Sequence, residues 1–352
     1  MNTFNVKAFG TESKESDLHQ MEIQRREVTP HDVEIDILYC GVCHSDIHTA
    51  RNDWGGSKYP VVPGHEIVGK ITKVGDHVTK FKVGDLAAVG CIVDSCRTCP
   101  SCQANLEQYC ENGMVGTYNG KDKFLNMQTF GGYSERVVVD ENYVLHVPEN
   151  LDLAAVAPVL CAGITTWSPL KHWNVGPSSK VAVVGLGGLG HMAIKLAKGL
   201  GAEVTLFSRT PSKTEDAKEL GCDEVIISTD EAQMKSVRGK FDVIIDTVPY
   251  DHDLNPYVTT LHHSGTLVLV GYLGMLEDSL NTSPMVVGRK AISGSMIGGI
   301  KETQELLDFC GEKNIVSDIE LIKIQDINEA YERMINSDVK YRFVIDMKSL
   351  KN

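Results

Sequence analysis

The run VAVVGLGGLG, residues 181–190, constrains the fold of this chain more than any other feature. It opens with four apolar residues, as expected of a β-strand that is buried on both faces. Gly185, Gly187 and Gly190 follow as G-x-G-x-x-G, and the helical pattern HMAIKLAKGLG begins directly after the last of them. In such a unit the first glycine makes a tight turn, the second admits a pyrophosphate, and the third lets helix and strand pack closely. The run therefore predicts a dinucleotide-binding βαβ unit.

The patterns downstream and upstream of this unit predict two different kinds of sheet. Downstream, VTLFS, EVIIS, FDVIIDTV and TLVLVG alternate with helical segments, which predicts a parallel sheet. Upstream, to about residue 150, runs such as HEIVGKITKVG and YSERVVV predict an irregular, mostly antiparallel β domain. The last strand, YRFVIDM, resembles this first part, so we expect the chain to return to it. A length of 352 residues also exceeds the ~250–300 residues of a single core, which favours two domains.

Charge and cysteine content narrow the class of function. The formal net charge of −13 disfavours nucleic acid and anionic membranes as partners. The N-terminus lacks the pattern of a signal peptide, and we find no apolar run of ~18 residues. Six of the ten cysteines lie in metal-like contexts, which fits a reducing compartment better than a disulfide scaffold. These features favour a cytoplasmic enzyme that acts on a small molecule.

Four cysteines cluster in one polar segment as C-x2-C-x2-C-x7-C: Cys96, Cys99, Cys102 and Cys110. Four thiolates can close a tetrahedron around Zn²⁺ with no position left for water, which is the pattern of a structural zinc site. An iron–sulfur cluster is the rival interpretation. Alone, the lobe could also belong to a nucleic-acid-binding zinc module, but the acidic charge disfavours that.

A second set of metal-ligand residues is dispersed along the chain: Cys43 in GVCHSDIH, His65 and Glu66 in PGHEIVG, and Cys161 in VLCAGITTW. Two thiolates and one imidazole leave one tetrahedral position open, as a catalytic zinc requires. Each residue alone has a plain structural reading. Nearby glycines permit close backbone approach, and Asp46 is expected to orient the imidazole as a supporting carboxylate.

The end of the second strand of the βαβ unit predicts which dinucleotide binds. NAD binding needs an acidic residue there to hold the adenosine ribose. This chain has Ser208, Arg209 and Thr210 instead, with Lys213 close behind. Such side chains suit a 2′-phosphate, so NADP(H) is expected. A solvated polar turn is the alternative.

Together these motifs resemble the zinc-containing medium-chain alcohol dehydrogenases. GVCHSDIH, YPVVPGHEIVG and DVKYRFVIDM resemble the branch of cinnamyl alcohol dehydrogenases and broad-range aldehyde reductases. The resemblance implies an α/β fold: a GroES-like, mostly-β catalytic domain (1–158 and 297–352) with an inserted doubly wound Rossmann domain (159–296). It also implies a catalytic zinc on Cys43, His65 and Cys161, with Glu66 as an alternate ligand.

The resemblance also assigns expected roles to single residues. Ser45 takes the position that contacts the substrate hydroxyl, and His48 takes the outer end of a proton relay. The remaining expected cofactor contacts are Thr165, Gly188, Leu189, Val270, Ser295 and Ile297. The expected substrate pocket is apolar: Trp54, Met114, Val115, Trp167, Met296 and Ile297. Plant cinnamyl-type enzymes have a tryptophan near Val115, so a strict preference for bulky phenolic aldehydes is not expected.

The predicted activity is the interconversion of primary alcohols and aldehydes with NADP(H), mainly as aldehyde reduction. We expect aromatic, α,β-unsaturated and medium aliphatic aldehydes to be substrates, because an apolar pocket discriminates weakly. The alternatives are an NAD(H)-dependent polyol or secondary alcohol dehydrogenase, a zinc-free quinone oxidoreductase, and a non-catalytic module. The two sets of ligand residues predict two zinc ions per chain. The resemblance further implies a homodimer joined near KAISGSMIGG, with a tetramer as the alternative.

Overall fold

The computed structural model describes residues 2–351 and divides into two compact units. Unit 1 comprises the residues up to Cys161 and those from Gly298 onward, and unit 2 comprises Ala162–Ile297. The chain therefore leaves the first unit, forms the second, and returns. The boundaries between the units fall after Cys161 and after Ile297. The sequence predicts them after residues 158 and 296.

Unit 1 is built on a seven-stranded sheet in the order β16-β17-β3-β4-β5-β9, with β8 also paired to β3. Neighbouring strands in this sheet run antiparallel, except that β16 and β17 run parallel to each other. The C-terminal strand β17 pairs with β3, which brings the end of the chain back to the first domain. The strands are β3 (Asp32–Gly41), β4 (Ile67–Val74), β5 (Leu86–Val89), β8 (Arg136–Asp140), β9 (Leu145–His146), β16 (Ile319–Lys323) and β17 (Arg342–Asp346).

The central strand β3 is almost entirely buried because it has neighbours on both edges and layers on both faces. Ile35 and Ile37 of β3 are among the largest fully buried side chains, as are Ile67 and Ile71 of β4, and Ile35 is paired directly with Ile71. The other strands of unit 1 are β1 (Thr3–Gly10), β2 (His19–Arg26), β6 (Ile92–Asp94) and β7 (Val115–Gly116). Its helices are α1 (His44–Arg51), α2 (Pro100–Gln103), α3 (Leu153–Val156), α10 (Ile300–Lys313) and α11 (Ile327–Ile335), with short 3-10 turns η1 (Glu107–Tyr109), η2 (Glu141–Tyr143), η3 (Ala157–Leu160), η5 (Ile324–Asp326) and η6 (Met347–Leu350).

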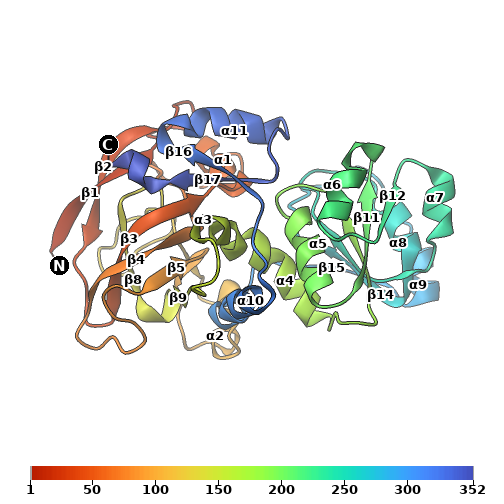
Figure 1. The fold of residues 1–352 in the computed structure, drawn as a ribbon, viewed down its shortest axis with the longest axis horizontal. Helices are drawn as coiled ribbons and strands as arrows, with labels where there is room; N and C mark the ends of the chain where they lie inside the picture. The colour runs from red at the N-terminus through yellow and green to blue at the C-terminus, as the bar shows by residue number, and fades with distance from the viewer. Residues whose placement is uncertain (1, 352) are drawn as a thin grey trace. The chain divides into compact units, whose positions relative to one another are not determined.

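Unit 2 is a parallel six-stranded sheet in the order β12-β11-β10-β13-β14-β15, with helices on both faces (Figure 1). Strand order reverses between β10 and β13, and in open α/β sheets ligands bind at the carboxyl ends of the strands at such a point. The strands are β10 (Lys180–Val184), β11 (Glu203–Ser208), β12 (Glu224–Ile227), β13 (Phe241–Asp246), β14 (Leu261–Leu269) and β15 (Ala291–Gly294). The helices are α4 (Ala162–His172), α5 (Gly190–Gly199), α6 (Thr214–Glu219), α7 (Glu231–Ser236), α8 (Asn255–Thr260) and α9 (Ser283–Gly288), with the 3-10 turn η4 (Pro211–Lys213).

Within residues 2–351, no single helix combines the length and hydropathy needed to cross a membrane. One bent pair, Leu153–Leu160 with Ala162–His172, meets the length and composition criteria together. Most residues of both segments are buried inside the protein, as in core helices.

Candidate functional site

The four cysteines of the polar lobe converge on one point. The sulfurs of Cys96, Cys99, Cys102 and Cys110 all lie within 4.8 Å of one another, and the Cys96 and Cys102 sulfurs are 3.9 Å apart. A tetrahedral zinc with bonds of about 2.3 Å separates its sulfurs by about 3.8 Å. The spacing therefore fits a closed tetrahedral site for a zinc ion.

Backbone N–H groups donate hydrogen bonds to three of these four sulfurs. The N–H groups of Cys99, Cys96 and Glu111 donate, each at 3.4 Å, to the sulfurs of Cys96, Cys110 and Cys99 respectively. A hydrogen bond from the Asn112 side chain, together with backbone N–H groups, lowers the pKa of Cys96 to about 5. Burial, by contrast, raises the pKa of Cys102 to about 11. Metal binding needs deprotonated cysteines, so a metal ion that binds here would displace the proton of Cys102.

The second cluster brings together the dispersed residues Cys43, His65, Glu66 and Cys161, all of them buried. Cys43 is the N-cap of α1, His65 and Glu66 directly precede β4, and Cys161 follows η3. Their ligand atoms lie within 4.8 Å of one another, and the two sulfurs are 3.9 Å apart. Two thiolates and an imidazole at this spacing fit a zinc site that keeps one position open.

Asp46 is the central support of this cluster. Its side chain is fully buried, and one carboxylate oxygen accepts hydrogen bonds from His65 Nδ1 at 3.1 Å and the Gly64 N–H at 3.1 Å. The other oxygen accepts from the Cys43 N–H at 2.9 Å and the Tyr133 hydroxyl at 3.2 Å. Holding Nδ1 leaves Nε2 of His65 for a metal, the arrangement in which a carboxylate orients a ligating histidine.

Glu66 lies beside the cluster in a buried ion pair with Arg342 of β17. Its Oε1 binds Arg342, whereas its Oε2 has no hydrogen-bond partner among residues 2–351. Burial raises the pKa of the Glu66 carboxyl to about 7, against the lowering effect of the Arg342 cation. A Cβ atom at Gly41 would lie 1.9 Å from Oε2, so a larger residue there would displace the Glu66 carboxylate. A buried carboxylate oxygen without a partner is costly, and a cation in the cluster would satisfy it.

Ser45 and His48 both extend from α1. The Ser45 hydroxyl donates to the Cys43 sulfur at 3.1 Å. His48 Nδ1 lies 2.8 Å from a carboxylate oxygen of Asp53, and its ring lies 4.8 Å from that of Trp54. Asp53 therefore fixes the orientation of the His48 ring and leaves Nε2 open.

The glycine-rich turn between β10 and α5 has the shape that a pyrophosphate needs. Gly185 has a φ of +87°, and a Cβ atom at Gly190 would lie 2.1 Å from the Gly185 carbonyl oxygen. A Cβ atom at Gly187 would meet nothing within 4 Å, so this side of the turn is open. Helix α5 has no side-chain N-cap, but the His191 N–H already donates to the Gly187 carbonyl at 3.0 Å, so an anion would bind to other N–H groups of the turn.

The segment after β11 collects polar and basic side chains. Ser208 donates its hydroxyl hydrogen to the Thr210 carbonyl at 2.8 Å, so Ser208 is not a free donor. The Thr210 and Ser212 hydroxyls lie 2.8 Å apart and share one hydrogen bond, which leaves one hydrogen for a ligand. Lys213 Nζ donates to the Leu186 carbonyl of the glycine-rich turn at 2.8 Å. Burial lowers the pKa of Lys213, but the ammonium stays within reach of the turn.

The remaining predicted cofactor residues lie in unit 2. Thr165 is a buried residue of α4, and Gly188 and Leu189 belong to the glycine-rich turn. The Val270 N–H is bonded to the Asp246 carbonyl at 3.0 Å, so a backbone contact to a ligand would use the Val270 carbonyl instead. Similarly, the Ser295 N–H is bonded to the Leu269 carbonyl at 3.1 Å.

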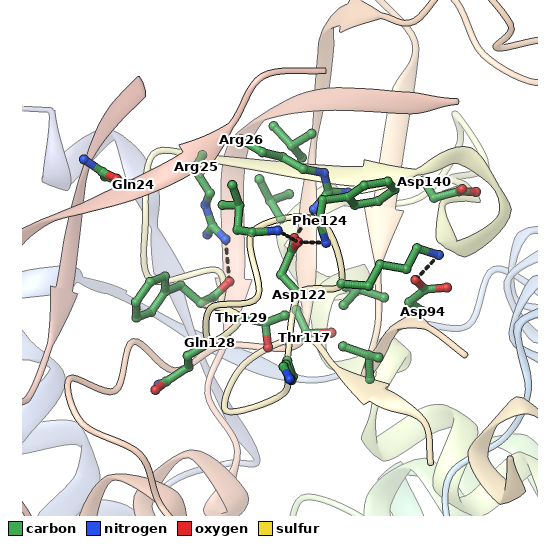
Figure 2. Close-up of a pocket in the computed structure, with 18 residues that line it drawn as sticks. Gln24, Arg25, Arg26, Asp94, Thr117, Asp122, Phe124, Gln128, Thr129 and Asp140 are labelled. Carbon is green, nitrogen blue, oxygen red and sulfur yellow. Dashed lines mark hydrogen bonds and ion pairs between the residues drawn. The ribbon is translucent and has the colours of Figure 1, made fainter. Parts of the chain in front are cut away.

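The predicted pocket residues divide between the units. Trp54, Met114 and Val115 belong to unit 1, and Trp167, Met296 and Ile297 belong to unit 2. Val115 lines a separate cavity of about 50 Å³, which Figure 2 shows beneath β2. Arg26 lines this cavity with Asp122, to which it is ion-paired, and Phe124 packs on the Arg26 guanidinium. Arg26 also forms an ion pair with Asp32. Because Arg26 and Asp122 neutralise each other, their ion pair indicates a structural role, in which it fastens the loop between β7 and β8 to β2.

Four residues of these sites were not predicted from the sequence. Asp53 is only five residues from His48, and Ser212 is two residues from Thr210. Their closeness in sequence to predicted site residues could have identified both. Arg342 and Tyr133 had none, because they reach the second cluster from β17 and from the loop before β8.

Family models identify the class of protein. Residues 29–149 match the alcohol dehydrogenase GroES-like domain, and residues 188–312 match the zinc-binding dehydrogenase domain. The chain belongs to the zinc-containing medium-chain alcohol dehydrogenases, with the predicted GroES-like and Rossmann-type architecture.

Individual relatives narrow the branch. The chain is 53% identical to the aldehyde reductase YahK of Escherichia coli over 98% of this chain and 99% of the relative. It is also 53% identical to the NADP-dependent alcohol dehydrogenase C 1 of Mycolicibacterium smegmatis, over 99% of both chains. Its structure matches that of CAD from Helicobacter pylori, complexed with NADP(H), with a TM-score of 0.91, 44% identity and 99% coverage of both chains. The chain thus falls in the predicted branch of cinnamyl alcohol dehydrogenases and aldehyde reductases.

Proposed function

We propose that this protein is a zinc-dependent oxidoreductase that interconverts primary alcohols and aldehydes with NADP(H), mainly as aldehyde reduction. The second cluster carries the proposal, because two thiolates and an oriented imidazole provide a three-ligand zinc site with an open position. The names of the relatives support the same activity. A zinc-free oxidoreductase would not need either cluster.

The chain's own residues have distinct roles in this proposal. Cys43, His65 and Cys161 hold the zinc, Asp46 orients His65, and Glu66 is an alternate ligand beside them. When bound, zinc polarises a carbonyl or hydroxyl oxygen, and the nicotinamide carries the hydride.

Ser45 and His48 are the proposed proton carriers. The Ser45 hydroxyl donates to the Cys43 sulfur and can turn to a substrate oxygen. His48 exchanges the proton with solvent at Nε2 while Asp53 holds Nδ1. Replacing Asp53 with Asn should lower kcat and leave zinc content unchanged.

A spectrophotometric screen of NADPH oxidation tests the proposed activity. The substrates are aliphatic, aromatic and α,β-unsaturated aldehydes, with sugars and polyols tested in the reverse direction. We expect benzaldehyde-like, cinnamaldehyde-like and medium aliphatic aldehydes to agree in kcat/KM within about two decades, because apolar contacts discriminate weakly. A polyol oxidised with NAD far better than any aldehyde is reduced would overturn the proposal.

We further propose two zinc ions per chain, one in each cluster. The sulfur separations of 3.9 Å in both clusters support this stoichiometry. Elemental analysis of gently purified protein should give two zinc ions per chain. Replacing Cys43 with Ala should abolish turnover, whereas replacing Cys99 with Ala should mainly lower stability. About one zinc ion or none in the unmodified protein would contradict the proposal.

A cytoplasmic homodimer joined through unit 2 is the proposed assembly. Strand β15 is an edge strand, with β14 as its one neighbour in the sheet order among the described residues. Met275, in the segment after β14, is 91% exposed, and Val286 and Val287 of α9 are 80% and 87% exposed. Exposed apolar side chains and an open strand edge both favour burial against a second copy. Light scattering at micromolar concentration should give the mass of a dimer, and a monomeric mass would refute it.

A further inference from the structure

Arg209 makes its side-chain contact across the carboxyl end of the sheet of unit 2. It follows β11, whereas Tyr250 follows β13, and these two strands flank β10 with its glycine-rich turn. The Arg209 guanidinium carbon lies 5.9 Å from the centre of the Tyr250 ring. The two side chains thus meet from opposite sides of the crevice where a dinucleotide is expected.

Hydrogen bonds through His252 connect the backbone of Tyr250 to Asp246 at the end of β13. The Tyr250 carbonyl accepts a hydrogen bond from His252 Nδ1 at 2.9 Å, and His252 Nε2 lies 3.0 Å from Oδ2 of Asp246. Asp246 is fully buried at the end of β13, and its Oδ1 accepts from the Val248 N–H at 3.1 Å. The segment that carries Tyr250 is therefore fastened to the core of the sheet.

The Arg209 guanidinium contacts the Tyr250 ring but is not neutralised by a carboxylate of the described residues. Among residues 2–351, no carboxylate lies within ion-pair distance of it, although the chain is strongly acidic. A cation–π contact uses none of the N–H hydrogens of a guanidinium, so they stay available to bind two oxygens of a phosphate. An arginine held against a ring also loses less side-chain freedom on binding than a mobile one.

We propose that Tyr250 is a positioning residue that holds Arg209 for the 2′-phosphate of NADP(H), and so contributes to the choice of cofactor. The inference rests on the proposed use of NADP(H). The ring contributes through Arg209, so it should affect only the cofactor that carries the 2′-phosphate. An exposed cation–π contact predicts an effect of about two- to fivefold on the Kd of NADPH.

A double-mutant cycle on the full-length, zinc-loaded protein tests this inference. The Kd values of NADPH and NADH are measured by fluorescence titration for wild type, Tyr250→Leu, Tyr250→Phe, Arg209→Ala and Arg209→Ala/Tyr250→Leu. Tyr250→Leu should weaken NADPH about two- to fivefold and leave NADH unchanged, while Tyr250→Phe should stay close to wild type. In the Arg209→Ala background, Tyr250→Leu should have no further effect.

Two results would overturn the inference: equal weakening of NADH and NADPH, which would assign the ring to the adenine, or no change in either. They are distinct from failure of the proposed cofactor use. If wild type binds NADH as tightly as NADPH, the NADP(H) proposal fails and the inference fails with it. If wild type prefers NADPH and Arg209→Ala removes the preference while Tyr250→Leu does not, only the role of Tyr250 fails.

Discussion

Removing the Asp46 carboxylate should lower the free energy of unfolding and should release the zinc ion of the second cluster. Four buried donors converge on Asp46, and two of them, the N–H groups of Cys43 and Gly64, are fixed in the backbone. Each buried donor left without a partner costs about 1–3 kcal/mol, so these two alone make Asp46→Ala less stable by about 2–6 kcal/mol. Loss of the support to His65 should also weaken zinc binding about 10- to 100-fold.

Asp46→Asn is the matched control. Its single oxygen can still accept from Gly64 and His65, but its amide group then faces the Cys43 N–H, which loses its acceptor. We expect a loss of about 1–3 kcal/mol and a nearly intact zinc site. Urea unfolding gives the free energies, and zinc content after dialysis against graded chelator gives relative affinity. The four-cysteine cluster serves as the internal reference, so Asp46→Ala should fall from two zinc ions to one. If it keeps both zinc ions and the wild-type urea midpoint, the role given to Asp46 is wrong.

Three further perturbations test other parts of the structure. Ser208→Asp should weaken NADPH binding about tenfold or more, because about 1.4 kcal/mol of repulsion between the new carboxylate and the 2′-phosphate suffices; titration with both cofactors checks this. Gly41→Ala places a methyl group against Glu66, and urea unfolding should show a loss of about 1–3 kcal/mol. Burial lowers the pKa of His252, but its hydrogen bond to Asp246 outweighs this and raises the pKa overall. The pair's stabilisation is therefore full below about pH 6.5 and is lost as pH rises through the raised pKa, so the urea midpoints of wild type and His252→Asn should converge toward alkaline pH.

Local patterns were sufficient where ligands and turn residues follow one another closely. The four-cysteine lobe and the glycine-rich turn each lie within fifteen residues, and both have the geometry that the chemistry requires. Strand and helix assignments succeeded for the same reason, because VAVVG and HMAIKLAKGLG carry their periodicity in the sequence. The return of the last strand to the first sheet was also predictable from its resemblance to that part.

Long-range partners were not predictable in this way. Arg342 neutralises Glu66 across 276 residues of sequence, and only the pairing of β17 with β3 brings it there. The contact of Tyr250 with Arg209 likewise depends on the order of β11, β10 and β13 in the sheet. Sequence alone also could not reveal that Ser208 uses its own hydrogen within the turn, which transfers the expected phosphate contacts toward Arg209 and its neighbours.

The central claim is that the second cluster holds a zinc ion that NADPH-dependent aldehyde reduction requires. Its most direct test is the steady-state reduction of a cinnamaldehyde-like aldehyde by zinc-replete protein, with NADPH and NADH compared at equal concentration and Cys43→Ala as the reference. We predict turnover by the wild type, a kcat/KM for NADPH about tenfold or more above that for NADH, and no turnover by Cys43→Ala. Equal kcat/KM values for the two cofactors, or undiminished turnover by Cys43→Ala, would contradict it.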